Sequence, residues 1–268
     1  MADLTRPIFL LTDFGTRDSY AGQVRAVIAG IAPHSLVVDL THDVEPFAVD
    51  HGAWLLESAL PALPPSAVVM AVVDPGVGSA RRGLLVLREG RAFIGPDNGV
   101  LSCAFPTELR DGRGGESPDV RELTDPRFHR PTVSATFHAR DIFGPVAAHI
   151  AAGVDYREVG PPAVNPVLLP PCCGRPASMG ELHGEIVHID RFGNIVTTIR
   201  AAQLFPSFEL EVAGRVIARH VRTFADAPPA EPFCHVDSSG FIAIAVNMGS
   251  AAATLGVGRR APVVVRAR

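Results

Sequence analysis

The sequence lacks three features, each of which would point to a particular class of protein. It has no excess of positive charge: 24 Lys and Arg against 28 Asp and Glu give a formal net charge of −4. Nucleic-acid binding depends on basic surfaces, so no nucleic-acid partner is expected. It has no C-x-x-C spacing typical of zinc sites, and its adjacent Cys172 and Cys173 cannot readily bridge to each other. Its apolar run near the N-terminus, residues 8–11, is too short for a signal peptide or membrane span. We therefore expect a cytoplasmic protein with reduced thiols and no membrane partner.

What the sequence does contain is enough apolar material for a large core. Hydrophobic residues make up 47% of the 268 positions and charged residues 19%, which argues against disorder and allows two domains of unequal size. Apolar runs predict strands at residues 7–12, 35–40, 66–73, 84–87 and 92–94, and helical spacing predicts helices at 21–31, 47–60 and 141–152. Strands that alternate with helices pair in parallel. The sequence therefore predicts an N-terminal α/β domain, residues 1–160, with a mostly parallel sheet.

The composition and the hydrophobic pattern of the sequence change after residue 160. Six prolines fall between residues 160 and 176, a composition that favours an extended linker, placed at 161–176. The following apolar runs mostly alternate with polar residues and are separated by glycine-containing turns. They predict strands at residues 186–189, 208–212, 216–221, 241–246 and 263–265. We therefore expect a smaller all-β domain, residues 177–268.

The segment VVDPGVGSARR, residues 72–82, is the strongest candidate for a reactive centre. A buried strand ends on Asp74, a tight Pro-Gly-Val-Gly turn follows, and Arg81 and Arg82 come next. Ligands of parallel α/β sheets bind at the carboxyl ends of the strands. Asp13 and Asn98 also follow strand-like runs, so all three side chains would gather at one sheet edge if those strands are neighbours. Taken singly, each is equally well explained as a turn or cap residue.

Other candidate signals are weak when they stand alone. His138 precedes a predicted helix, and a single histidine is more often a surface or packing residue. His188 and Asp190 alternate onto one strand face, but no third and fourth ligand accompany them, so no metal site is expected. Gly76 and Gly78 lack the Gly-Lys-Ser/Thr ending of a phosphate-binding loop.

Seven segments, in order along nearly the whole chain, match one known family. They are LLTDFGTRDSY (10–20), VVDLTHDVEPF (37–47), VVDPGVGSARRG (72–83), GPDNGVLS (95–102), TFHARDIFGPVAAH (136–149), DRFGNIVT (190–197) and NMGSAA (247–252). At these segments the sequence resembles the S-adenosyl-L-methionine hydroxide adenosyltransferases, relatives of the fluorinating and chlorinating enzymes. The resemblance implies a barrel-like C-terminal domain. It also implies a homotrimer whose pocket lies between the N-terminal domain of one subunit and the C-terminal domain of the next.

The resemblance further implies hydrolysis of S-adenosyl-L-methionine to adenosine and L-methionine, with water attacking the ribose 5′ carbon and no cofactor. The family's water-activating Asp, Arg and His fall on Asp74, Arg81 and His138. Arg82 is the rival to Arg81, although the spacing favours Arg81. The choice of base between His138 and Asp74 stays open. Halogenating relatives lack this set, so its presence favours water over a halide.

The substrate contacts are also implied by the resemblance. Two carboxylate oxygens of Asp13 would accept hydrogen bonds from the two ribose hydroxyls. Further contacts would come from Asp18 and Asp190 at the methionine ammonium, Asn194 at the adenine edge, Phe47 and Phe192 against the ribose and adenine, and Asn247 and Ser250 as additional polar groups. Two alternatives remain. One is a halogenase, which the charge of Asp74 disfavours because it would repel a halide; the other is a non-catalytic adenosyl-binding protein, which would not require Asp74, Arg81 and His138.

Overall fold

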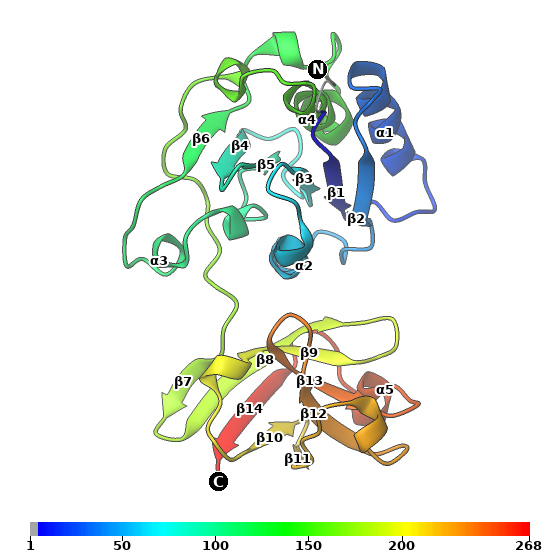
Figure 1. Ribbon diagram of the computed structural model, residues 1–268, viewed down its shortest axis with the longest axis vertical. Helices are drawn as coiled ribbons and strands as arrows, with labels where there is room; N and C mark the ends of the chain where they lie inside the picture. The colour runs from blue at the N-terminus through cyan, green and yellow to red at the C-terminus, as the bar shows by residue number, and fades with distance from the viewer. Residues whose placement is uncertain (1–4) are drawn as a thin grey trace. The chain divides into compact units, whose positions relative to one another are not determined.

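The computed structural model describes residues 5–268, which form two compact units. The first unit extends to Pro171 and the second covers Cys172–Arg268 (Figure 1). Within this described part of the chain, no helix has both the length and the apolar character needed to cross a membrane.

The first unit is built on a six-stranded sheet with the order β2-β1-β3-β5-β4-β6. Its strands are β1 (Ile8–Thr12), β2 (Val37–Thr41), β3 (Val68–Val72), β4 (Gly83–Arg88), β5 (Arg91–Pro96) and β6 (Asp119–Glu122). The first four in this order pair in parallel, whereas β4 pairs antiparallel with both β5 and β6. The sheet is mixed because β4 and β5 form a hairpin. Glu89 and Gly90 turn it, both with positive φ, as a two-residue hairpin loop requires.

Helices cover both faces of this sheet. The helices are α1 (Tyr20–Ile31), α2 (Val49–Ala59), the short α3 (Thr107–Arg110) and α4 (Gly144–Ala151). Alternate side chains of β3 enter two separate cores: Val68 and Met70 pack with residues of α1 and α4, and Val69 packs with residues of α2. All five residues of β3 are therefore buried, as in strands of a parallel sheet covered on both sides. The expected α/β architecture is confirmed.

The helix expected at residues 141–152 consists of two parts. A π-helical turn, Ala139–Phe143, precedes α4, and the Gly144 N–H donates to the Ala139 carbonyl five residues back. Pro145 has no N–H to donate to the carbonyl of Asp141. That carbonyl instead accepts a hydrogen bond of 2.9 Å from the backbone N–H of Arg130. The proline therefore accounts for the wider turn just after His138.

The second unit is an antiparallel, nearly closed sheet. Its strands are β7 (Arg175–Ser178), β8 (Glu181–Ile189), β9 (Ile195–Arg200), β10 (Phe208–Val212), β11 (Arg215–Ile217), β12 (Pro232–Val236), β13 (Phe241–Val246) and β14 (Pro262–Ala267), with the helix α5 (Ala251–Leu255). The order is β11-β10-β14-β8-β9-β13-β12, and β7 pairs with β8. Hydrogen bonds from Cys234 N to Arg219 O (2.8 Å) and from Val221 N to Cys234 O (3.1 Å) join the two ends. The barrel-like domain is confirmed, but β7, β9 and β12 were not expected from the sequence.

The first part of the proline-rich segment is bound to the first unit. Ala163 N donates to Val120 O (2.8 Å), and Leu169 N donates to the Ser102 hydroxyl (2.7 Å). Arg110 Nε donates to Leu169 O (3.2 Å). The two compact units separate between Pro171 and Cys172, inside the expected linker.

Candidate active site

Three of the polar side chains singled out in the sequence follow neighbouring parallel strands. Asp13 comes directly after β1, Asp74 lies two residues beyond β3, and Asn98 lies two residues beyond β5. These three strands are adjacent and parallel in the sheet. Their carboxyl ends meet at one sheet edge, as the sequence predicted, and this edge is where α/β proteins bind ligands.

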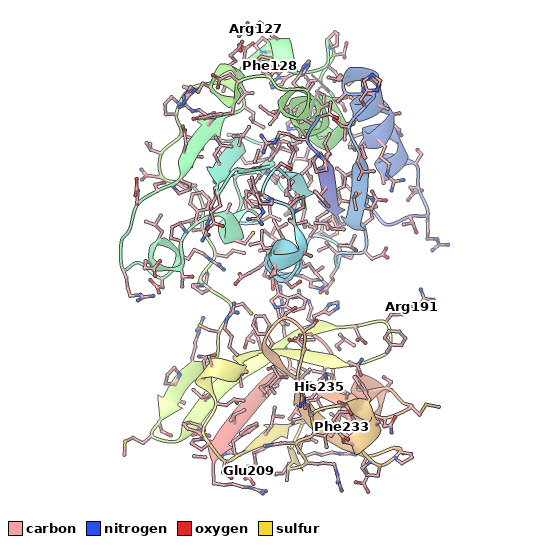
Figure 2. The ribbon with its side chains drawn as sticks, in the orientation of Figure 1. Arg127, Phe128, Arg191, Glu209, Phe233 and His235 are labelled. Atoms are coloured by element: carbon pink, nitrogen blue, oxygen red, sulfur yellow. The ribbon has the colours of Figure 1, made fainter. Side chains whose placement is uncertain are left out.

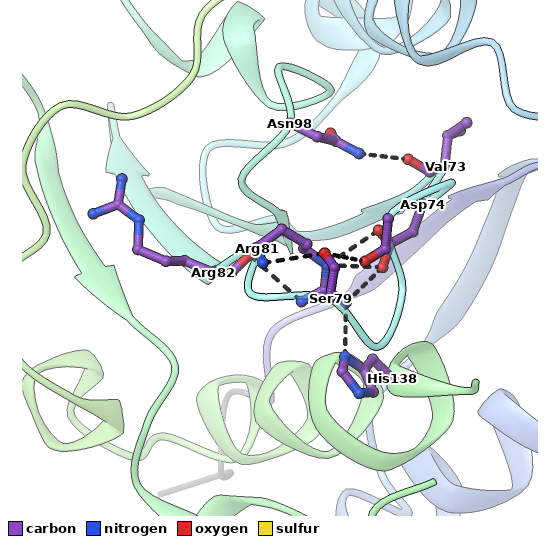
Figure 3. A network of polar contacts seen from close by, with 8 residues as sticks. Val73, Asp74, Ser79, Arg81, Arg82, Asn98 and His138 are labelled. Carbon is purple, nitrogen blue, oxygen red and sulfur yellow. Dashed lines mark hydrogen bonds and ion pairs between the residues drawn. The ribbon is translucent and has the colours of Figure 1, made fainter. Parts of the chain in front are cut away.

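An ion pair joins the two ends of the glycine-containing loop at this edge. Arg81 Nε lies 3.1 Å from each carboxylate oxygen of Asp74, and Arg81 Nη2 lies 2.5 Å from Asp74 Oδ2 (Figure 3). The side chains are only 12% and 6% exposed. Charges that are shielded from water interact more strongly than surface charges. The pair therefore places a fixed cation and a fixed anion at the end of β3.

His138 adds a third group to this pair from another part of the chain. Its Nδ1 lies 2.7 Å from Arg81 Nη2. Because a guanidinium can only donate, Nδ1 must accept, and the proton of the neutral ring lies on Nε2. Burial, followed by the Arg81 cation, lowers the pKa of His138, while Asp74 and Asp141 act in the opposite direction. The ring is therefore held in the neutral form at neutral pH.

Close packing between two loops brings these groups together. Gly78 has φ +79°, and a Cβ at this position would lie 2.4 Å from the carbonyl oxygen of Ala135. Only glycine allows the loop after Asp74 to approach the segment that leads to His138 so closely. The Arg81 guanidinium also lies over the ring of Phe143, 5.1 Å from its centroid.

The neighbouring arginine has a different set of partners. Arg82 donates to Asp97 Oδ2 through Nε (2.8 Å) and Nη2 (2.6 Å), and to the carbonyls of Val164 and Asn165 (3.0 Å each). In Figure 3 its side chain runs away from the Asp74 carboxylate. Of the two adjacent arginines, the structure brings Arg81 to Asp74 and His138.

Asp13 lies in a loop that is tied to the loop after β2. Its Oδ2 accepts the backbone N–H of Phe47 (3.0 Å), which has φ +65° and a 73% exposed side chain. The Thr12 hydroxyl lies 2.8 Å from His42 Nδ1, and Gly15 N donates to His42 O (2.7 Å). The carboxylate of Asp13 is thus oriented by two loops rather than one.

Three aromatic rings connect the Asp13 loop with the His138 segment. Ring centroids of Phe14 and Phe137 are 5.9 Å apart, and Tyr20 lies 6.0 Å from Phe14 and 5.2 Å from Phe137. The sequence reasoning gave these rings no role, although Phe14 and Phe137 directly adjoin Asp13 and His138. Asp18 lies in the exposed segment that leads into α1.

In the second unit, the candidate residues of the β8–β9 loop bond within that loop. Asp190 Oδ1 accepts the N–H groups of Phe192 (2.8 Å) and Asn194 (2.9 Å), and Oδ2 accepts Asn194 Nδ2 (2.8 Å). Phe192 is 77% exposed. Figure 2 labels the adjacent Arg191 on this loop. Asp190 and Asn194 are therefore together, and the loop that they close presents an aromatic ring to the outside.

Ser250 packs against the same loop. A Cβ on Gly193, which has φ +83°, would lie 2.0 Å from Ser250 Oγ, and Ala252 N donates to Gly193 O (3.0 Å). Ser250 also caps α5, because its Oγ accepts Ala253 N–H (3.1 Å). Asn247 is directed elsewhere, since its Nδ2 donates to Ala227 O (2.9 Å).

Potential metal ligands are not gathered in this way. Among residues 5–268, no group of three or more His, Cys, Asp or Glu side chains is arranged so that it could hold a metal ion.

Comparisons with known proteins match both units to one family. The model of the SAM hydroxide adenosyltransferase N-terminal domain matches residues 8–160, and that of the C-terminal domain matches residues 184–264. An (R)-S-adenosyl-L-methionine hydrolase of Thermus thermophilus is 40% identical over 268 residues, covering 96% of this chain and 98% of that protein. One from Salinispora arenicola is 43% identical over 255 residues, covering 93% and 94%.

More distant relatives and solved structures agree with this placement. A fluorinase of Actinopolyspora mzabensis is 28% identical and covers 92% of this chain and 93% of its own length. The crystal structure of an uncharacterized conserved protein of Thermotoga maritima superposes with a TM-score of 0.85 at 32% identity, covering 97% and 100% of the two chains. From both domain models and these relatives, the chain belongs to the S-adenosyl-L-methionine hydroxide adenosyltransferase family.

Proposed function

We propose that this protein hydrolyses S-adenosyl-L-methionine to adenosine and L-methionine, with water attacking the ribose 5′ carbon. Relatives that are 40% and 43% identical over most of the chain are named (R)-S-adenosyl-L-methionine hydrolase, whereas the fluorinases are more distant. The observation that carries the proposal is the Arg81 guanidinium, which joins the Asp74 carboxylate on one side and His138 on the other.

The substrate's own chemistry sets what the residues must do. Attack at the 5′ carbon forms a carbon–oxygen bond and breaks the carbon–sulfur bond, and the sulfonium leaves as the neutral thioether of methionine. No acid is needed for this leaving group, and the water loses one proton. Free water is a very weak acid, so a nearby fixed cation must stabilise the developing hydroxide.

Each of the three groups has a distinct role in this proposal. Arg81 is the cation, held in place by Asp74 and by the ring over which it lies. His138 Nδ1 already accepts a hydrogen bond from Arg81, so it can take a proton only after Arg81 moves. Among the described residues, Asp74 Oδ1 accepts only from Arg81 Nε, so it keeps a lone pair for the water. We therefore propose Asp74 as the first acceptor and His138 as the group that fixes Arg81.

The substrate is held by residues of both units in this proposal. Asp13 binds the ribose hydroxyls beside Phe47, and Asp18 lies near the methionine end. Asp190, Phe192, Asn194, Asn247 and Ser250 supply the contacts from the second unit. We propose a homotrimer in which a second subunit completes each pocket, because the candidate contacts are divided between the two units. We also propose that no metal takes part, since Arg81 supplies the cation beside the water.

The names of the curated relatives also suggest a stereochemical preference. Both are named for the (R) sulfonium epimer. We propose that this protein likewise prefers that epimer.

The test is to incubate pure protein separately with the (R) and (S) sulfonium epimers and to quantify nucleoside and amino-acid products. Adenosine and methionine in equal amounts, formed in the presence of a chelator, are expected. Added chloride or fluoride should yield no 5′-halogenated nucleoside. A halogenated product would instead favour the halogenase, and tight binding without turnover of either epimer would favour the non-catalytic binding protein.

A further inference from the structure

We propose that Asp97 and Asn98 are positioning residues for the Asp74–Arg81 pair, one residue for each partner. Both residues come directly after β5, in the GPDNG segment, residues 95–99. The proposed function assigns no role to either residue. The inference rests on the proposed function, because it concerns the same hydrolytic site.

Asn98 fixes the backbone just before Asp74. Its Nδ2 donates to the carbonyl oxygen of Val73 (2.8 Å), and its Oδ1 accepts the N–H of Val100 (3.1 Å) (Figure 3). The main-chain pairing of β3 with β5 has already ended at Met70. The Asn98 side chain therefore provides the link between the two strand ends at the point where the chain leaves the sheet. This link sets the direction in which Asp74 projects.

Asp97 fixes the residue that follows Arg81. Its Oδ2 accepts two hydrogen bonds from the Arg82 guanidinium, and its backbone N–H donates to Arg82 O (3.0 Å). The Asp97 side chain is only 5% exposed. Both the side chain and the carbonyl of Arg82 are thus tied to one residue. This arrangement keeps Arg82 away from Asp74 and leaves Arg81 as its partner.

Together the two residues fix both ends of the loop that carries the ion pair. The loop from Asp74 to Arg81 contains two glycines and the closely packed Gly78 turn. A flexible loop of this kind needs fixed ends if a guanidinium is to stay within 3 Å of both a carboxylate and an imidazole. Small displacements of catalytic groups are costly, roughly 100-fold in rate for about 1 Å. Loss of either residue should therefore lower kcat without changing substrate binding.

A purely structural role has to be distinguished from this one. Asp97 Oδ1 also accepts Val167 N–H (2.7 Å), so part of its contribution is to hold the proline-rich segment. Ser102, three residues beyond the GPDNG segment, offers a matched control. It is fully buried, its hydroxyl donates to Gly99 O (2.6 Å), and it accepts Leu169 N–H (2.7 Å). Ser102→Ala removes buried hydrogen bonds without loosening either end of the Asp74–Arg81 loop.

The kinetic test compares Asn98→Ala, Asp97→Asn and Ser102→Ala with the unmodified protein. The first two should lose about 10- to 100-fold in kcat while KM and the Kd for adenosine stay unchanged. Ser102→Ala should melt at a lower temperature but keep its kcat. If it loses as much kcat as the other two, or if they retain full kcat, the positioning role is refuted.

A second readout does not depend on turnover. Titration of the His138 ring by NMR reports whether Arg81 still reaches it, because the Arg81 cation lowers the pKa of His138. That pKa should rise in Asn98→Ala and Asp97→Asn and stay unchanged in Ser102→Ala. Removing the charge of Asp97 would by itself lower the pKa, so a rise reports displacement of Arg81. Absence of hydrolysis by the unmodified protein would overturn the proposed function alone. An unchanged pKa of His138 in both variants would overturn this inference. If one variant does not fold, the other still decides the outcome.

Discussion

The two units hold their candidate residues in different ways. In the first unit, contacts join distant segments: Asp74 follows β3, and its partner Arg81 reaches His138, which lies 57 positions further along. In the second unit, Asp190 bonds Phe192 and Asn194 within one hairpin loop. Contacts between distant elements can hold charged side chains in a fixed geometry, shielded from water, and such an arrangement favours catalysis. A loop closed on itself keeps its shape while exposing a ring, which suits recognition of a ligand.

Of the changes considered, removing the Arg81 cation in the first unit should have the largest effect on kcat. Arg81→Met keeps the aliphatic stem but removes the hydrogen bonds that Arg81 donates to the Asp74 carboxylate and to His138. We therefore expect kcat to fall by roughly 10²–10³-fold while adenosine still binds. Steady-state kinetics and calorimetry measure the two quantities. Arg127→Met is the matched control, because Arg127 pairs with Asp125 at the surface. A variant that loses adenosine binding instead would make Arg81 a binding residue and remove the contrast between the units.

The decrease in kcat at acidic pH should reveal the protonation state of His138. The neutral ring accepts the Arg81 hydrogen bond, and protonation at Nδ1 abolishes it. Because burial and Arg81 lower the pKa of His138 from its usual 6.5, kcat should be level above that pH. It should then fall up to about tenfold per pH unit as the pH drops through the lowered pKa. A decrease in kcat with its midpoint above pH 6.5 would contradict this account.

Changes in the second unit should act on binding. Asn194→Ala removes one polar contact proposed for adenine, so KM should rise about tenfold, the equivalent of a single hydrogen bond, with kcat retained. Thr223→Ala, in a different loop where its hydroxyl donates to Asp226, serves as a control. A fall in kcat at constant KM would place this loop with the chemistry.

Hybrid oligomers should give the smallest effect. They test whether the first unit of one chain and the second unit of another chain form one pocket. Asp74→Ala and Asn194→Ala chains are co-expressed with different tags, and hybrids are assayed well below KM. With pockets shared between subunits, roughly a quarter combine two intact halves, so hybrids should exceed the better parent. Hybrids that never exceed that parent would show that each pocket forms within one chain.

The sequence predicted the sheet edge more reliably than the contacts along it. Asp13 and Asp74 could be placed because buried apolar runs end directly before them. The sequence pattern could not decide between Arg81 and Arg82, since the two residues are adjacent and each pairs with a carboxylate. Only the structure shows that Arg82 pairs with Asp97. The family resemblance favoured Arg81 from spacing alone.

The features that the fold prediction missed also have physical causes. The β4–β5 hairpin turns on Glu89 in the left-handed region, a conformation that its residue type does not signal. The strand β12 begins with a proline, which usually argues against a central strand, and here it lies at the end of the sheet order. In β9, five of six residues are buried, so no alternation marks it as a strand.

Hydrolysis in oxygen-18 water tests the central claim most directly, with the unmodified protein and Arg81→Met compared on the same substrate. If Asp74, Arg81 and His138 direct water to the ribose 5′ carbon, mass spectrometry should find the label in the 5′ hydroxyl of adenosine and none in methionine. The Arg81→Met sample should contain little labelled adenosine at equal substrate occupancy. Unlabelled adenosine from the unmodified protein, or labelled homoserine with methylthioadenosine, would show that water attacks elsewhere and would contradict the account.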